Sequence, residues 1–327
     1  MGDSMFVIMG AIALAATPSA TPRPPAQSLG ESLASVRSFA RGPGEALWPG
    51  YGSAPFEFLL VEATKETLLC RTAVPDGFKA AGRDENVDCR RFVRDRTSLS
   101  DTLLAAMPLF GPPPTIVMGN PKTTNRTPAS WLRTILHEHF HQWQFSLPDY
   151  FKRTDALDLK GGDTTGMWVL TYRFPYAKPE VIALQSAASN ALADAVDARG
   201  TSAFAARLAA YLEKRDAFRG GVSEKDWRYI EFQLWQEGVA RWTEIQLGKA
   251  YPDESVVKSA ELLEQRTVEA LRKPDLKNQE REFVYAYGAS EAMLLAACGP
   301  KWRTHYPLVM QMGALLDEAR KACAHPL

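Results

Sequence analysis

The sequence predicts an α+β fold in which a small N-terminal β-sheet region packs on a predominantly helical C-terminal region. Residues 28–127 are rich in glycine and proline and contain short strand-like runs between these breakers. After residue 127, apolar residues recur with the helical period, and long helices are expected. The chain has 327 residues, of which 46% are hydrophobic, so it can bury a sizeable core in one large domain or two modest ones.

The first 27 residues are expected to be a signal peptide and a linker. Residues 5–16 form an apolar run with the length of a signal-peptide core, too short to span a bilayer comfortably. Residues 13–15 (Ala-Leu-Ala) offer a cleavage site, and residues 17–25 are rich in proline, threonine and alanine. We therefore expect export to the periplasm or secretion, and no stable membrane span. An uncleaved tail is the alternative, because no lysine or arginine precedes the run.

The charge balance argues against a nucleic-acid partner. Lysine and arginine together number 38, and aspartate and glutamate also number 38. A nucleic-acid-binding chain usually has a basic excess or a basic block, and this chain has neither.

Four cysteines fit an oxidising compartment. Cys70 lies near Cys89 in sequence, and Cys298 lies near Cys323. Two local disulfides are therefore expected, although spacing alone does not fix the pairing. None of the four has the spacing of a zinc finger, so a structural zinc site held by cysteines is not expected.

The N-terminal part, residues 28–127, is expected to form the sheet. Strand-like runs cover residues 56–61, 67–70 and 115–118, and a short helix is expected over residues 99–107. The last run follows three prolines and stops at Gly-Asn-Pro. It is either an edge strand, to which an extended substrate could add, or an ordinary core strand.

The C-terminal part, residues 128–327, begins with a well-marked helix. Thr127 is a suitable N-cap and Pro128 a suitable first helical residue, and the helix should end near Ser146. Residues 155–176 contain several glycines and a strand-like run at 168–172, so a loop and a hairpin are expected. Further helices are expected over residues 179–199, 202–218, 223–248, 254–272, 280–298 and 307–322.

The helix after Thr127 carries a His-Glu-x-x-His motif, formed by His137, Glu138 and His141. Residues four apart lie one helical turn above each other, so the two imidazoles can converge on one metal ion. Glu138 lies about 100° around the helix from His137, where it cannot be a third ligand but can reach a metal-bound water. The motif therefore predicts a metal centre with Glu138 as the general base.

The same helix has an apolar stripe, which should anchor it in the core and leave the two ligand histidines facing a cleft. His139 falls inside this stripe and is interpreted as a buried core histidine, not a ligand. The alternative for the pair is a solvated helix face with no metal. The stripe consists of Leu132, Ile135, Leu136, Phe140 and Trp143.

A catalytic zinc ion usually has three protein ligands and one open position. Glu237 is the preferred third ligand, because it borders the buried face of a helix and precedes Gly238, which lets another backbone or a ligand approach closely. Spacing alone fits equally well a solvated glutamate paired with Arg241. His305 and His325 are the other possible ligands. The three-histidine extension of the metzincins is absent.

These motifs together resemble the gluzincin metallopeptidases, and in particular the aminopeptidase N-like branch. In this chain the motif continues with Gln142-Trp143, as it often does in that family. Residues 234–240 (LWQEGVA) are similar to the family's third-ligand helix, Leu-Trp-x-x-Glu-Gly-x-Ala. Residues 285–289 (YAYGA) are similar to its Tyr-x-x-Gly-Ala segment. The resemblance covers roughly residues 135–297, with the three motifs in the family's order.

The resemblance implies a zincin-like catalytic region and a zinc-dependent peptidase. In that reading, Zn²⁺ is bound by His137, His141 and Glu237, Glu138 is the general base, and Tyr285 stabilises the oxyanion. Tyr287, Tyr172 and Arg173 remain alternatives for that last role. A peptide or protein is then the substrate. A non-catalytic zincin-like binding protein is the alternative function.

Glu244 has two readings as well. It lies seven residues after Glu237 on the same helix face, where it can support a ligand histidine by a hydrogen bond. An ion pair with Arg241 on the surface explains it equally well.

The sequence also departs from the family pattern. The spacing between His141 and Glu237 is long, so residues 155–221 are interpreted as an insertion or a lid. The family's Gly-x-Met-Glu-Asn strand, which holds the free amino terminus of the substrate, has no counterpart. Residues 117–120 (VMGN) take the expected place but contain no glutamate. The resemblance thus implies metallopeptidase chemistry without aminopeptidase specificity.

Overall fold

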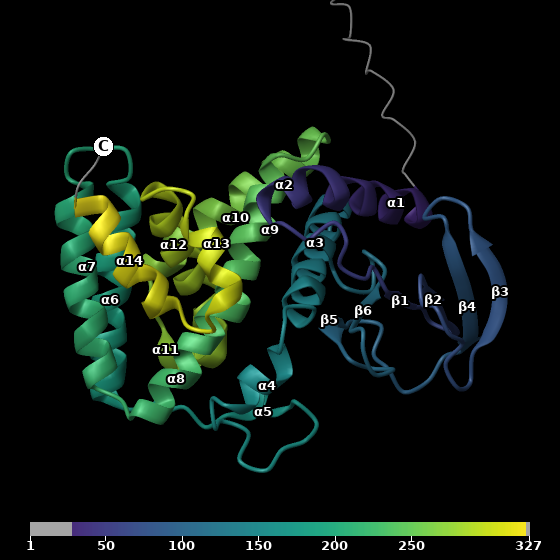
Figure 1. Ribbon diagram of the computed structural model, residues 1–327, viewed down its shortest axis with the longest axis horizontal. Coiled ribbons are helices and arrows are strands. Elements are labelled where there is room, and N and C mark those ends of the chain that lie inside the picture. The colour runs from purple at the N-terminus through teal and green to yellow at the C-terminus, as the bar shows by residue number, and fades with distance from the viewer. Residues whose placement is uncertain (1–27, 325–327) are drawn as a thin grey trace, which may run out of the picture.

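The structure of the protein is a computed structural model that describes residues 28–324. The expected signal peptide and linker and His325 lie outside the described residues. The α+β class is confirmed: one mixed sheet lies in the first half, and helices dominate the rest. Figure 1 shows the sheet at one end of the molecule and the C-terminal helices at the other, with α3 (Pro128–Phe145) between them.

The sheet has six strands in the order β3-β4-β2-β1-β6-β5. Strands β1 and β6 are parallel, and the other neighbouring pairs are antiparallel. The pairing of β1 with β6 sets Leu59 opposite Val117. The strands are β1 (Phe58–Val61), β2 (Lys65–Leu69), β3 (Lys79–Asp84), β4 (Cys89–Asp95), β5 (Leu104–Met107) and β6 (Thr115–Gly119).

The prediction of a helix over residues 99–107 is wrong. Residues 104–107 form strand β5, which pairs with β6 so that Leu104 lies opposite Met118. The leucines and alanines of this segment favour a helix locally, but the free edge of β6 offers ladder hydrogen bonds that override that preference. Strand β6 consequently has β1 on one side and β5 on the other, so the reading of β6 as an edge strand open to a substrate is also wrong.

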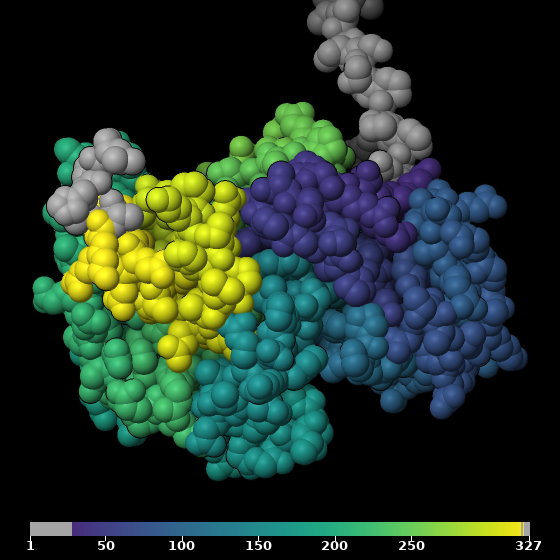
Figure 2. Space-filling view, viewed as in Figure 1, coloured from purple at the N-terminus to yellow at the C-terminus, as the bar shows by residue number. Residues whose placement is uncertain are grey.

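The N-terminal part begins with helices that the sequence patterns did not predict. Helix α1 (Leu29–Phe39) starts with a capping box, in which Ser28 and Glu31 bond reciprocally to each other's backbone amides. The π-helical turn η1 (Ala40–Gly44) and α2 (Glu45–Leu47) continue it. Figure 2 shows this N-terminal segment, in purple, lying across the junction between the sheet and the C-terminal helices.

The helical part confirms most of the expected elements. Helix α3 has Thr127 as its N-cap and Pro128 at its first position, as predicted. The remaining elements are α4 (Tyr150–Asp155), α5 (Trp168–Thr171), α6 (Pro179–Asp197), α7 (Phe204–Gly220), α8 (Glu224–Gln233), η2 (Leu234–Gly238), α9 (Val239–Lys249), α10 (Glu254–Arg272), α11 (Leu276–Gln279), η3 (Glu280–Glu282), α12 (Phe283–Ala297), α13 (Trp302–His305), η4 (Tyr306–Leu308) and α14 (Met312–Ala324).

Two expectations in this part are corrected. The hairpin strand expected at residues 168–172 is the short helix α5, which begins where the Asp163 carboxylate accepts a hydrogen bond from the Trp168 amide. Trp168 then stacks on Phe232, so burial of its aromatic ring decides the local structure. The single helix expected over residues 223–248 is interrupted by the π-helical turn η2.

The sheet rests on α3 through one large apolar core. Phe58 and Ile116 from the sheet share this core with Trp131 and Ile135 of α3. The opposite face of the sheet has its own smaller apolar cluster, in which Leu59 is buried together with other strand and loop residues. Because side chains alternate along a strand, β1 contributes to both clusters. Among the described residues, no helix is both long and apolar enough to cross a membrane.

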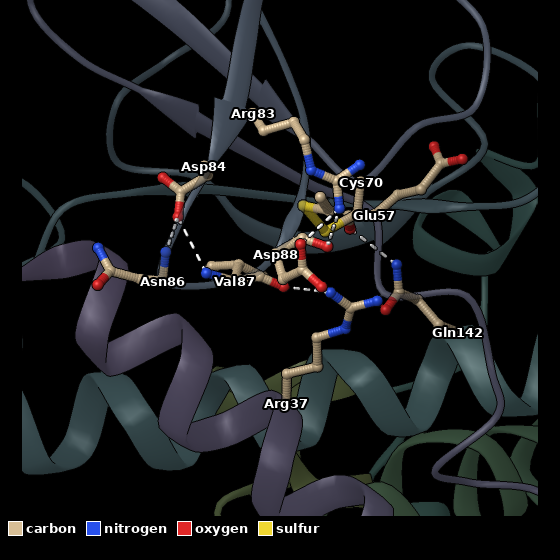
Figure 3. The surroundings of a disulfide bond; sticks show 10 residues. Arg37, Glu57, Cys70, Arg83, Asp84, Asn86, Val87, Asp88 and Gln142 are labelled. Atoms are coloured by element: carbon tan, nitrogen blue, oxygen red, sulfur yellow. Dashed lines mark hydrogen bonds and ion pairs between the residues drawn. A yellow bond between two sulfur atoms is a disulfide. The ribbon is translucent and has the colours of Figure 1, made fainter.

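Both disulfides join the pairs that are near in sequence. Cys70 and Cys89, with Cα atoms 4.9 Å apart, link the end of β2 to the start of β4, and Cys298 and Cys323 link the end of α12 to α14. Figure 3 shows the first bond beside Arg37 of α1, whose guanidinium donates to the carbonyl of Val87. This contact ties the β3–β4 turn to α1, next to the disulfide that joins β2 to β4.

Candidate metal centre

Helix α3 is buried on all sides, which differs from the expected helix with one core face and one open face. His137, Glu138 and His141 are only 4%, 6% and 5% exposed. The reason is that α9 packs along α3 beside the histidines, while the sheet covers another side. The apolar stripe is buried as predicted.

The structure brings the three predicted ligands together. Nε2 of His141 lies 3.1 Å from Nε2 of His137, and Oε2 of Glu237 lies 3.2 Å from His141 Nε2 and 3.7 Å from His137 Nε2. The three groups are buried, and their ligand atoms are close enough to hold one metal ion. Two ring nitrogens and a carboxylate oxygen gathered in one buried place form a donor set suited to a divalent cation.

The charges of the cluster also favour a cation. Burial alone would raise the pKa of Glu237, but the neighbouring His141, His137 and Arg281 hold this pKa well below its usual range. Burial favours neutral His137, yet contacts with Glu237 and Glu244 outweigh it and raise the pKa of His137 to about 9. The carboxylates of Glu237 and Glu244 therefore stabilise positive charge on His137.

Each ligand histidine has a partner behind it. His137 Nδ1 lies 3.3 Å from Oε2 of Glu244, and His141 Nδ1 lies 2.7 Å from Oε1 of Gln144. The hydrogen bond to Gln144 holds a proton on Nδ1 of His141 and leaves its Nε2 lone pair free for a metal. Nδ1 of His137 has the Glu244 carboxylate nearby but makes no hydrogen bond of good geometry to it. Gln144 was missed in the sequence, where its only signal is its place three residues after His141 on the same helix. Its amide nitrogen donates to the carbonyl of Gln236, which fixes its orientation.

Glu244 contacts both groups between which the sequence left the choice open, His137 and Arg241, but it does so inside the protein. Besides facing His137, its Oε2 pairs with Arg241 at 3.1 Å, and its Oε1 pairs with the buried Arg133. Burial raises the pKa of Glu244, but the two arginines and His137 outweigh this and lower it to about 2. The pair with Arg241 is not a surface ion pair, because Glu244 is 2% exposed.

His139 is a core histidine, as predicted. It is 1% exposed and packs edge-on against Tyr51 and Phe56, away from the metal ligands. Its Nε2 donates to the Tyr51 carbonyl at 3.1 Å. Burial lowers the pKa of His139 to about 4, so the ring is neutral at physiological pH.

Glu237 lies in the π-helical turn η2, a distortion that is frequent at functional sites. Gly238, directly after it, touches Gly288 of α12, and a Cβ at Gly238 would lie 2.4 Å from the Cα of Gly288. The prediction that this glycine allows a close backbone approach is confirmed. The crossing brings α12, and Tyr285 with it, next to the ligands.

Replacing Gly288 with alanine is expected to destabilise the protein by about 1–3 kcal/mol, because the added Cβ would lie 2.7 Å from the carbonyl oxygen of Leu234. Chemical denaturation measures this change. Gly220→Ala is the control, since a Cβ there meets nothing within 4 Å and a helical alanine is neutral or slightly stabilising. Equal free energies of unfolding for the two variants would contradict the prediction and show that η2 and α12 can move apart without loss of stability.

Tyr285 is the predicted phenol that the structure places near the ligands. The centre of its ring lies 6.0 Å from that of His137. Burial raises the pKa of Tyr285, so its hydroxyl stays protonated and able to donate. The alternatives lie elsewhere: Tyr287 packs near Tyr211, and the Tyr172 hydroxyl donates to Asp226. Arg173 is exposed.

His305 is not part of the centre. It lies at the end of α13, is exposed, and its Nδ1 contacts Glu318. The structure instead adds Arg281, which the sequence analysis missed. Its guanidinium donates to Oε1 of Glu237 at 2.6 Å. The only signal in the sequence was an arginine one helical turn before Tyr285.

Comparison of the chain with protein-family models, curated proteins and solved structures found no match. The resemblance to the gluzincins stays a prediction that depends on the motifs and on the arrangement of the site.

Proposed function

We propose that the protein is a zinc-dependent hydrolase of the gluzincin type, acting on peptide bonds, with His137, His141 and Glu237 as zinc ligands. The observation that carries the proposal is the ligand triangle, with edges of 3.1, 3.2 and 3.7 Å. Ligand atoms about 2.0–2.1 Å from a tetrahedral zinc ion lie roughly 3.3 Å from each other, so the residues fit this metal. The hydrogen bond at Nδ1 of His141 supports the same assignment.

The residues around the triangle suit hydrolysis. Zinc, when bound, supplies Lewis acidity that makes hydroxide available near neutral pH. Glu138 takes the proton from the attacking water and delivers it to the leaving amine. Tyr285 donates a hydrogen bond to the oxyanion that develops on the carbonyl. Gln144 holds the imidazole of His141 in the tautomer that binds metal, and the Glu244 carboxylate lies 3.3 Å from the corresponding nitrogen of His137.

A non-catalytic, zincin-like binding protein is the second proposal. It is favoured by the burial of the ligands, which are 4–7% exposed, because a structural zinc needs no access for substrate. The two proposals differ in whether Glu138 has a chemical role.

Export remains part of the proposal. Two disulfides within the described residues are consistent with an oxidising compartment, where such bonds form and persist.

The purified protein is expected to contain one zinc ion per chain and to cleave members of a peptide library. Elemental analysis measures the metal, and mass spectrometry of the library measures cleavage. A chelator should abolish cleavage and added zinc should restore it. His141→Ala should lose the metal, whereas His305→Ala, which changes an exposed histidine outside the centre, should keep it. Bound zinc without any cleavage would contradict the hydrolase and favour the binding protein.

A further inference from the structure

Arg281, in η3, contacts groups from three different elements. Its Nε donates to Oε1 of Gln233 on α8 at 2.9 Å, and one terminal nitrogen donates to Oε1 of Glu237 on η2 at 2.6 Å. The other terminal nitrogen lies 3.4 Å from the hydroxyl of Tyr285 on α12. The planar guanidinium can serve three acceptors at fixed angles, which a lysine ammonium on a flexible stem cannot do in the same geometry.

The contact with Glu237 determines which of its oxygens faces the histidines. Arg281 holds Oε1, and Oε2 is the atom that lies 3.2 Å from His141. Without the arginine, the carboxylate could rotate, or turn both oxygens towards a metal. An arginine–carboxylate bond is short and directional, so it restricts the carboxylate to one orientation.

The contact with Tyr285 determines whether its hydroxyl donates or accepts a hydrogen bond. When the Tyr285 oxygen accepts from Arg281, its own proton remains free for another acceptor. Two guanidinium groups also lie over the ring, with Arg241 5.1 Å and Arg281 5.6 Å from its centre. Cations over the ring faces favour this ring position.

Gln233, which accepts a hydrogen bond from Arg281, is itself fixed by a further hydrogen bond. The amide nitrogen of Gln233 lies 3.4 Å from the carbonyl oxygen of Val169 in α5, and the Tyr229 hydroxyl donates to the same oxygen at 3.1 Å. Gln233 is fully buried, so its carbonyl is fixed towards Arg281. The hydrogen bonds therefore run from α5 through Gln233 and Arg281 to the ligand Glu237.

We propose that Arg281 is a positioning residue. It fixes the orientation of Glu237 as a metal ligand and, at the same time, that of Tyr285 as a hydrogen-bond donor. The part concerning Tyr285 rests on the proposed hydrolase function. The part concerning Glu237 requires only that the centre binds a metal ion.

The test compares Arg281→Lys and Arg281→Met with the wild type. Zinc affinity is measured by competition with a chelator, and ligand geometry by the visible absorption spectrum of the cobalt-substituted protein. Both variants should bind zinc about 10–100-fold more weakly, the usual effect of losing a partner behind a ligand. Both should also show an altered cobalt spectrum, because the carboxylate can reorient. In peptide hydrolysis, kcat should fall more than KM changes.

Arg71 provides a matched control. It forms an ion pair with Glu57 at 2.7 Å and is 13% exposed, against 14% for Arg281, but it lies in the sheet region. Arg71→Lys and Arg71→Met should leave the zinc affinity and the cobalt spectrum unchanged, even if they lower stability.

Wild-type zinc affinity and an unchanged cobalt spectrum in Arg281→Lys would overturn the proposal. If Arg281→Met does not fold, the lysine variant, which keeps the charge, decides alone. Zinc affinity and the cobalt spectrum can be measured without catalysis. If the protein binds zinc but does not cleave peptides, the proposed function is contradicted, and these two measurements still test the role of Arg281.

Discussion

Glu138→Gln is expected to lower kcat/KM for peptide hydrolysis by about 10²–10⁴-fold while zinc content stays at the wild-type level. Glutamine has nearly the same shape, but it cannot take a proton from the attacking water. Glu138 is not one of the three groups that form the ligand triangle, so the metal should remain bound. Steady-state kinetics on a cleaved peptide and elemental analysis of the same sample measure the two quantities.

Glu66→Gln is the control for removing a buried carboxylate. Glu66 is fully buried in β2, where it pairs with Arg94, and it lies outside the metal centre. This variant should lose stability but keep its turnover and its zinc. Wild-type turnover in Glu138→Gln would contradict the general-base role and leave the binding-protein alternative standing.

Glu237→Ala is expected to weaken zinc binding by more than about 100-fold, beyond what the loss of a residue behind a ligand costs. It removes one of the three ligand atoms and also leaves Arg281 without its carboxylate partner. Dialysis followed by elemental analysis measures the retained metal, and chelator competition measures the affinity.

Glu237→Gln separates these two effects. The amide oxygen can still accept from Arg281, so the fold should suffer less, but the ligand charge is lost. We expect weak zinc binding in both variants and a larger loss of thermal stability in the alanine variant. Zinc retained at wild-type affinity in both would show that another group is the third ligand.

The grouping of His137, His141 and Glu237 was predictable from local signals for the two histidines, whereas Glu237 was preferred to a solvated glutamate through the resemblance to the gluzincins. His137 and His141 are four residues apart on one helix, and the start of that helix is marked by Thr127 and Pro128. The glycine after Glu237 indicated a close helix contact, and Gly288 now provides it. These features depend on helix geometry and backbone sterics, which act within a few residues.

The groups behind the ligands were not predictable in the same way. Arg281 acts through a hydrogen bond to Glu237, which is far away in sequence, and nothing near Arg281 specifies that partner. Gln144 bonds to His141 only three residues away, but its orientation is set by the carbonyl of Gln236, which is far away in sequence. The same holds for β5, whose sequence favours a helix until β6 offers it a partner. The π-helical turn η2 also escaped prediction, because the apolar pattern continues through it with little change.

The crossing of Gly238 and Gly288 has a consequence for how this chain can evolve. Neither glycine carries a functional group, yet a side chain at either position would force η2 and α12 apart and separate Glu237 from Tyr285. Among descendants that keep the metal centre, the two glycines are therefore expected to vary as little as the ligands themselves.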